Sequence, residues 1–137
     1  MVDMGWNMPL LCGGVNNKKG VTVKKIFRPY QTALVTSIET AWHAGQKNVL
    51  AVLPTGGGKT VVFADILQRN DGPSVAIAHR QELVGQMSLA LAHNDVMHRI
   101  VAPLPVISRI VGQHVQQTGR SWYHPLSQCG VAGVDTL

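Results

Sequence analysis

The sequence is poor in charged and aromatic residues. Charged residues make up 14% of the 137 residues and aromatic residues 5%, whereas apolar residues reach 45%. A chain of this composition is a globular protein rather than a disordered segment, and aliphatic side chains must supply most of its core. The length allows one domain at most.

Cysteine is also scarce. Cys12 and Cys129 lie far apart and form no Cys-X-X-Cys pair, so neither a disulfide framework nor a zinc site is predicted. No apolar run approaches the ~20 residues that cross a bilayer, and the first residues lack the basic start of a secretory signal. We therefore expect a reduced, cytoplasmic protein with no membrane partner.

Basic residues exceed acidic ones, which gives a formal net charge of +5. This excess permits a nucleic-acid partner without proving one. The densest clusters are Lys18–Lys19 and Lys24–Lys25 with Arg28, and a solvated basic arm explains them equally well. Residues 1–24 show no periodicity and are predicted to be a poorly ordered leader, followed by an incomplete domain over residues 25–137.

The pattern of apolar residues predicts an α/β fold with a mainly parallel sheet. Helices are expected over 29–44, 60–68, 80–93 and 106–117, and strands over 48–53, 74–78 and 129–134. The run at 48–53 is nearly all apolar, which is typical of a strand buried on both faces of a parallel sheet. Pro103 and Pro105 are expected to break the chain before the last helix.

A glycine-rich loop follows the first predicted strand and opens a helix. Its glycines let successive amides point into one concavity at a helix N-terminus, which suits a phosphate group. The lysine would place a cation on the β- and γ-phosphates of ATP, and the threonine would offer its hydroxyl to Mg²⁺. The alternative is a glycine-rich turn with an exposed lysine. The predicted ATP-binding residues are Thr55, Gly56, Gly57, Gly58, Lys59 and Thr60, with Lys59 and Thr60 catalytic and Thr60 the metal ligand.

This loop departs from the general P-loop pattern, because Leu53 stands where the first glycine is expected. The form Pro-Thr-Gly-X-Gly-Lys-Thr resembles motif I of superfamily 2 helicases. Upstream, residues 27–31 (Phe-Arg-Pro-Tyr-Gln) resemble the R-P-Y-Q element of the same superfamily. Downstream, residues 75–86 resemble motif Ia in the A-H-R-X-E-L form of the type III restriction-enzyme and UvrB-like branch.

The resemblance implies a partial RecA-like domain and several further contacts. Arg28 and Gln31 would contact ATP, with the Gln31 amide reading the adenine edge. The strand ends and helix starts of this branch touch the nucleic-acid backbone. The alternatives are an exposed amide for Gln31, a backbone-bonded histidine and ordinary exposed helix positions. The nucleic-acid contacts implied in this way are His79, Arg80, Gln86 and Thr136.

Neither the Asp-Glu-X-His box of these helicases nor a second RecA-like domain is found in the sequence. The expected function is therefore an ATP-binding N-terminal segment of an ATP-dependent DNA helicase or translocase, truncated before the box. The expectation that the nucleic acid is DNA rather than RNA rests on the resemblance alone. A non-hydrolysing ATP- or nucleic-acid-binding fragment and a small P-loop kinase are the alternatives. Without later strands, residues 49–53 would expose an apolar edge, which predicts a marginally stable, aggregation-prone chain.

Overall fold

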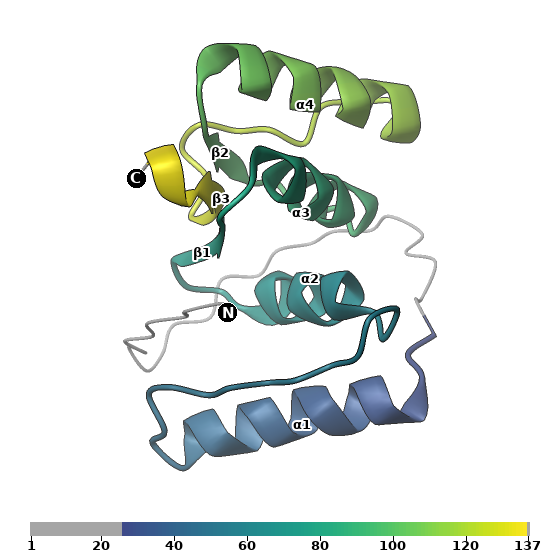
Figure 1. Ribbon diagram of the computed structural model, residues 1–137, viewed down its shortest axis with the longest axis vertical. Helices are drawn as coiled ribbons and strands as arrows, with labels where there is room; N and C mark the ends of the chain where they lie inside the picture. Colours follow the sequence, from purple (N-terminus) through teal and green to yellow (C-terminus); the bar gives the residue numbers. More distant parts are fainter. Residues whose placement is uncertain (1–25, 137) are drawn as a thin grey trace.

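From residue 59 onward helices and strands alternate along the chain, whereas the two helices before residue 70 follow each other with no strand between them (Figure 1). The computed structural model describes residues 26–136, so the predicted leader and the lysine clusters at 18–19 and 24–25 lie outside the described residues. In chain order the elements are α1 (Pro29–His43), α2 (Lys59–Arg69), β1 (Ser74–Ala78), α3 (Gln81–His93), β2 (Arg99–Val101), α4 (Leu104–Thr118), β3 (Cys129–Gly133) and the 3₁₀ helix η1 (Val134–Thr136).

The described strands form one parallel sheet in the order β1-β3-β2. The last strand in sequence is therefore central, with Ala78 of β1 beside Gly133 and Val101 of β2 beside Ala132. Parallel neighbours need crossover connections, which α3 and α4 help to provide. The α/β fold with a parallel sheet is confirmed.

Helix α2 is buried on two faces and joins the two parts of the core. Its Ala64 and Leu67 belong to the cluster around the sheet, together with Val84, Leu91, Ile110 and Val131 among others. Its Val62 and Ile66 pack instead against α1. Figure 1 shows the resulting order, with α1 at one end of the molecule, α2 next to it and α3 and α4 beyond.

The predicted strand over residues 48–53 is wrong. These residues form an irregular segment between α1 and α2, and within residues 26–136 no strand pairs with them (Figure 1). Val49 and Leu53 pack against the α1–α2 cluster, whereas Leu50 and Val52 are 78% and 77% exposed. A strand needs a hydrogen-bonded neighbour, and an apolar run by itself does not supply one.

Other element bounds differ from the predictions for local reasons. Arg80 caps α3 rather than opening it, and α4 begins at Leu104 with Pro105 in its first turn. A proline is tolerated there because the first amides of a helix lack intrahelical partners, so the prolines mark a helix start rather than a break. Strand β2 is too short to leave a pattern, and Val134 belongs to η1 rather than to β3.

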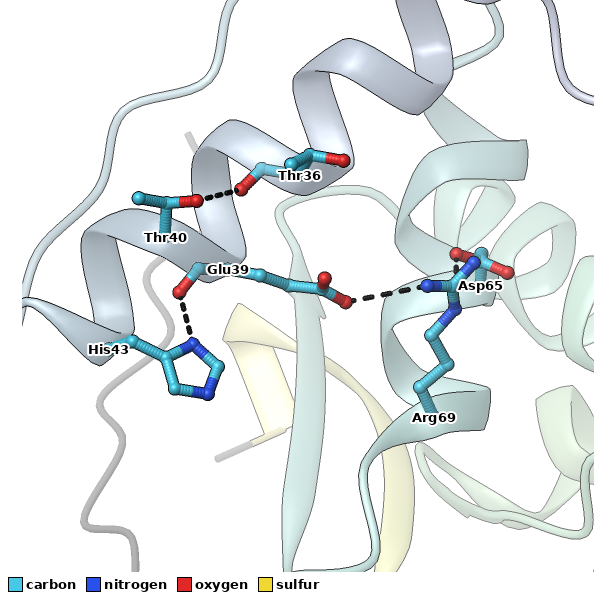
Figure 2. A network of polar contacts seen from close by, with 6 residues as sticks. All are labelled: Thr36, Glu39, Thr40, His43, Asp65 and Arg69. Carbon is cyan, nitrogen blue, oxygen red and sulfur yellow. Dashed lines mark hydrogen bonds and ion pairs between the residues drawn. The ribbon is translucent and has the colours of Figure 1, made fainter.

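An ion-pair network links α1 to α2 on the surface (Figure 2). Arg69 lies 3.6 Å from Glu39 of α1 and 2.9 Å from Asp65 of its own helix. Because Arg69 and Glu39 are substantially exposed, such contacts contribute only about 0–1 kcal/mol each. The apolar cluster between α1 and α2 therefore dominates their association.

A buried chain of hydrogen bonds connects α3, α4 and the residues before β2. Ser88 Oγ lies 2.6 Å from His98 Nε2 and 2.9 Å from His114 Nε2. His98 Nδ1 must donate to the Val96 carbonyl, so its Nε2 accepts the Ser88 hydroxyl. The Trp122 amide donates to His114 Nδ1, so the His114 Nε2–H donates to Ser88. Both rings are consequently neutral, and the two histidines are core residues.

We predict that this chain of bonds makes the fold acid-sensitive. Burial lowers the pKa of His98 from 6.5 to about 4, and burial also lowers the pKa of His114. The unfolded chain then binds protons more readily than the folded chain. The contribution of these histidines to the free energy of unfolding is therefore fully present above pH ~6.5 and is lost as the pH falls toward ~4. For His98 the full loss is about 3 kcal/mol. Urea unfolding at about pH 7, 6 and 5 measures this loss of free energy of unfolding. These pH values lie mostly above the range in which carboxylates titrate.

The exposed His43 provides the matched control. His43→Gln is expected to keep the same decline in unfolding free energy with falling pH. A free energy that stays constant between pH ~7 and ~5 in the wild-type chain would contradict the prediction.

Candidate nucleotide-binding site

The glycine loop, defined as residues 54–58, turns sharply between the irregular segment and α2. Gly56 and Gly58 have φ values of 78° and 82°, in the left-handed region that glycine adopts without strain. The Gly57 amide donates to the Pro54 carbonyl over 2.9 Å and closes the turn. Gly58 is then the N-cap of α2, so the curl leads directly into a helix N-terminus.

Each glycine of the loop is required for a different reason. A Cβ on Gly57 would lie 2.9 Å from the Pro54 carbonyl oxygen, and a Cβ on Gly58 would overlap Nε2 of Gln31. A Cβ on Gly56 would meet nothing within 4 Å, so only its backbone conformation favours glycine there. The loop is therefore closely packed on the side that faces Pro54 and Gln31, which we call its inner side, and open on the opposite side.

The open side carries the groups that suit a polyphosphate. Lys59 and Thr60 form the first turn of α2, and both are exposed. The first amides of a helix have no intrahelical partners and sit at the positive end of its dipole. The first turn of α2 contains no acidic residue to offset this. An anion and the Mg²⁺ that accompanies it fit this set of amides, ammonium and hydroxyl.

The first turn of α1 contacts the loop from its inner side. Tyr30 Oη donates to the Gly57 carbonyl over 3.1 Å, and Gln31 Nε2 donates to the same oxygen over 3.0 Å. The Arg28 guanidinium donates in turn to Tyr30 Oη over 3.4 Å. The structure thus brings Gln31 to the loop directly and Arg28 to it through Tyr30, and the contact of Arg28 with ATP stays a prediction. It adds Tyr30, which the sequence reasoning missed although its position next to Gln31 was a signal.

Gln31 already has partners at both ends of its amide. The Gln31 side chain is 6% exposed, and its Oε1 accepts the Arg28 amide over 3.0 Å while its Nε2 binds Gly57. A primary amide has a second N–H and a second lone pair, so each end retains capacity for one more bond. The alternative of an exposed amide is wrong, and the adenine contact stays a prediction.

The residues predicted to contact nucleic acid gather largely at one edge of the sheet, where β1 and β3 end. His79 and Arg80 follow β1, and Thr136 lies in η1 directly after β3. Because Ala78 and Gly133 are register partners, these residues emerge side by side. We call this edge of the sheet, at which His79, Arg80 and Thr136 lie, the carboxyl edge. Gln86 is exposed further along α3, so it is set back from the other three residues.

Acidic groups for metal or water activation are not gathered at the loop. Asp65, in α2, is ion-paired with Arg69 at the far end of the helix from Lys59. Among residues 26–136 no group of three or more His, Cys, Asp or Glu side chains could hold a metal ion. The Mg²⁺ contact of Thr60, in the first turn of α2, stays a prediction.

The parallel sheet, the glycine loop and the helix that it opens define a partial RecA-like P-loop domain. The family model of the type III restriction enzyme res subunit, a superfamily 2 helicase domain, matches residues 24–115, and the chain belongs to this family. Neither a curated protein nor a solved structure matches the chain. Within the described residues, no helix is both long and apolar enough to cross a membrane.

The loop geometry predicts that Gly58→Ala is more damaging than Gly56→Ala. Both substitutions place a side chain in the left-handed region, at a cost of about 1–2 kcal/mol. Only a Cβ on Gly58 also displaces the Gln31 amide from the Gly57 carbonyl, and the lost hydrogen bond adds about 0.5–1.5 kcal/mol. Urea unfolding of the two variants measures the difference. Equal losses of stability would contradict the filled inner side of the loop.

Proposed function

We propose that this chain is the ATP-binding N-terminal segment of an ATP-dependent DNA helicase or translocase. The observation that carries the proposal is the glycine loop at the start of α2, with Lys59 and Thr60 exposed on its open side. The loop lies inside the region that matches a helicase family. That family membership favours a helicase over a small P-loop kinase.

The roles of the loop residues follow from their chemistry. The amides at residues 56–60 bind the phosphate oxygens, and the Lys59 ammonium neutralises charge on the β- and γ-phosphates. The Thr60 hydroxyl ligates Mg²⁺, and Thr55 lines the mouth of the loop. Arg28 and Gln31 lie on the α1 side, where the adenine would rest.

The carboxyl edge is the proposed surface for DNA. Arg80 is exposed at the N-cap of α3, where its guanidinium and the first amides of the helix both suit a phosphate. His79 and Thr136 follow neighbouring strands at the same edge, where they would contact other phosphates, and Gln86 would extend the surface along α3. Contacts of this kind recognise the nucleic-acid backbone rather than the bases. Binding tests must therefore compare RNA with DNA.

Binding without turnover is the second candidate function. Hydrolysis in P-loop helicases needs carboxylates that support Mg²⁺ and orient the attacking water. No two acidic residues are adjacent anywhere in this sequence, and the nearest carboxylate in α2 is paired with Arg69. We therefore expect the chain alone to bind ATP and Mg²⁺ with little or no hydrolysis.

Removing the Lys59 ammonium is expected to weaken ATP binding. A hydrogen bond to a charged group contributes about 1.5–3 kcal/mol, so Lys59→Ala should raise the Kd for Mg-ATP about ten- to hundredfold. Isothermal titration calorimetry measures this directly. Lys47→Ala removes the same charge from another exposed lysine and serves as the control. Equal affinities of the Lys59 and Lys47 variants would exclude the proposed phosphate site, and DNA-stimulated phosphate release by the wild type would exclude binding without turnover.

Arg80→Ala is expected to weaken DNA binding without changing ATP affinity. A lost phosphate contact lowers affinity uniformly across sequences and reduces the salt dependence by about one unit of slope. Fluorescence anisotropy with two unrelated DNA oligonucleotides and one RNA, over a salt series, measures both effects. Arg109→Ala, at an exposed arginine of α4, is the matched control. A salt slope that falls equally in both variants would argue against the carboxyl edge.

A further inference from the structure

The carbonyl of Gly57 receives two side-chain donors from consecutive residues of α1. Tyr30 Oη lies 3.1 Å from this oxygen and Gln31 Nε2 lies 3.0 Å from it, although these residues are 27 and 26 positions away in sequence. Gly57 itself is buried. The carbonyl is therefore directed toward α1 and away from the open side of the loop.

Fixing this carbonyl also fixes the next amide. A trans peptide group is planar, and its C=O and N–H point in opposite directions. With the Gly57 oxygen bound to α1, the Gly58 N–H faces the other way, toward the open side where a phosphate would lie. Three successive glycines have wide backbone freedom. Contacts from outside the loop are thus needed to keep this peptide from turning over.

Of the two donors, Tyr30 has a hydroxyl that faces a single acceptor. The Arg28 guanidinium has donors only, so its contact with Tyr30 Oη leaves the phenolic hydrogen for Gly57. Gln31 is different, because its amide also caps the start of α1 through the Arg28 amide. Any rotation of the Gln31 amide toward a ligand leaves Tyr30 as the donor on the Gly57 carbonyl.

We infer that Tyr30 is a positioning residue for phosphate binding, whose hydroxyl orients the Gly57–Gly58 peptide so that its amide faces the polyphosphate. The inference rests on the proposed function, since it assigns Tyr30 to the same ATP site. Tyr30 contacts the loop backbone and not the ligand. Its effect should therefore be the same for any ligand that carries the phosphate chain, with or without a base.

Tyr30→Phe tests the inference, because it removes the hydroxyl and keeps the ring. One hydrogen bond contributes about 0.5–1.5 kcal/mol, which corresponds to about a two- to tenfold higher Kd. Calorimetry on the full chain with Mg-ATP and with Mg-tripolyphosphate should show the same factor for both probes. Tyr123→Phe, which alters the other tyrosine of the sequence, should leave both affinities unchanged.

A second measurement follows the loop directly. In spectra of the chain labelled with ¹⁵N-glycine, Tyr30→Phe should shift the Gly57 and Gly58 signals and leave Gly45 and Gly119 in place. Unshifted Gly58 signals would overturn the inference even if the affinity falls for another reason. So would an unchanged Kd for tripolyphosphate, or a loss confined to ATP, since the latter would mean a contact with the base. A wild-type chain that binds neither probe would overturn the ATP-binding proposal itself, which the wild-type titration alone decides.

Discussion

The contact between α1 and the Gly57 carbonyl is the constraint that holds the shape of the glycine loop. The glycine loop has no side chains that could fix its own shape, and two of its residues adopt left-handed conformations. Its order is supplied from outside, by Tyr30 and Gln31 on the inner side and by the start of α2 on the other. A change in the first turn of α1 therefore reaches the backbone of the glycine loop.

Helix α2 extends this constraint to the rest of the molecule. One of its faces packs on α1 through Val62 and Ile66, and another packs on the sheet cluster through Ala64 and Leu67. The central strand β3 in turn places the residues that follow β1 and β3 at one edge. The glycine loop and the carboxyl edge are thus joined through tightly packed side chains, which have little freedom to move independently.

The sequence allowed the four helices and two of the three strands to be predicted, and the wrong or missing predictions have physical causes. The helical spacing of apolar residues located α1 and α3, because such spacing is typical of a helix with one side against the core. Residues 48–53 were mistaken for a strand, because an apolar run reports a tendency to be buried and not the presence of a neighbour. The Ser88–His98–His114 chain and the Tyr30 contact join residues distant in sequence, and no local pattern records such geometry. The roles of Arg28, Arg80 and Thr136 were inferred from resemblance and still await experiment.

The proposed binding of ATP and its hydrolysis would need different groups of the chain. The irregular segment before the loop exposes Leu50 and Val52 and has no strand partner within residues 26–136, yet the loop keeps its turn. It does so because Val49 and Leu53 pack on the α1–α2 cluster and because α1 binds the Gly57 carbonyl. The proposed phosphate binding relies on this backbone and on the Lys59 ammonium. Hydrolysis needs carboxylates placed opposite the loop, and the loop's own helix offers only Asp65, which is already paired with Arg69.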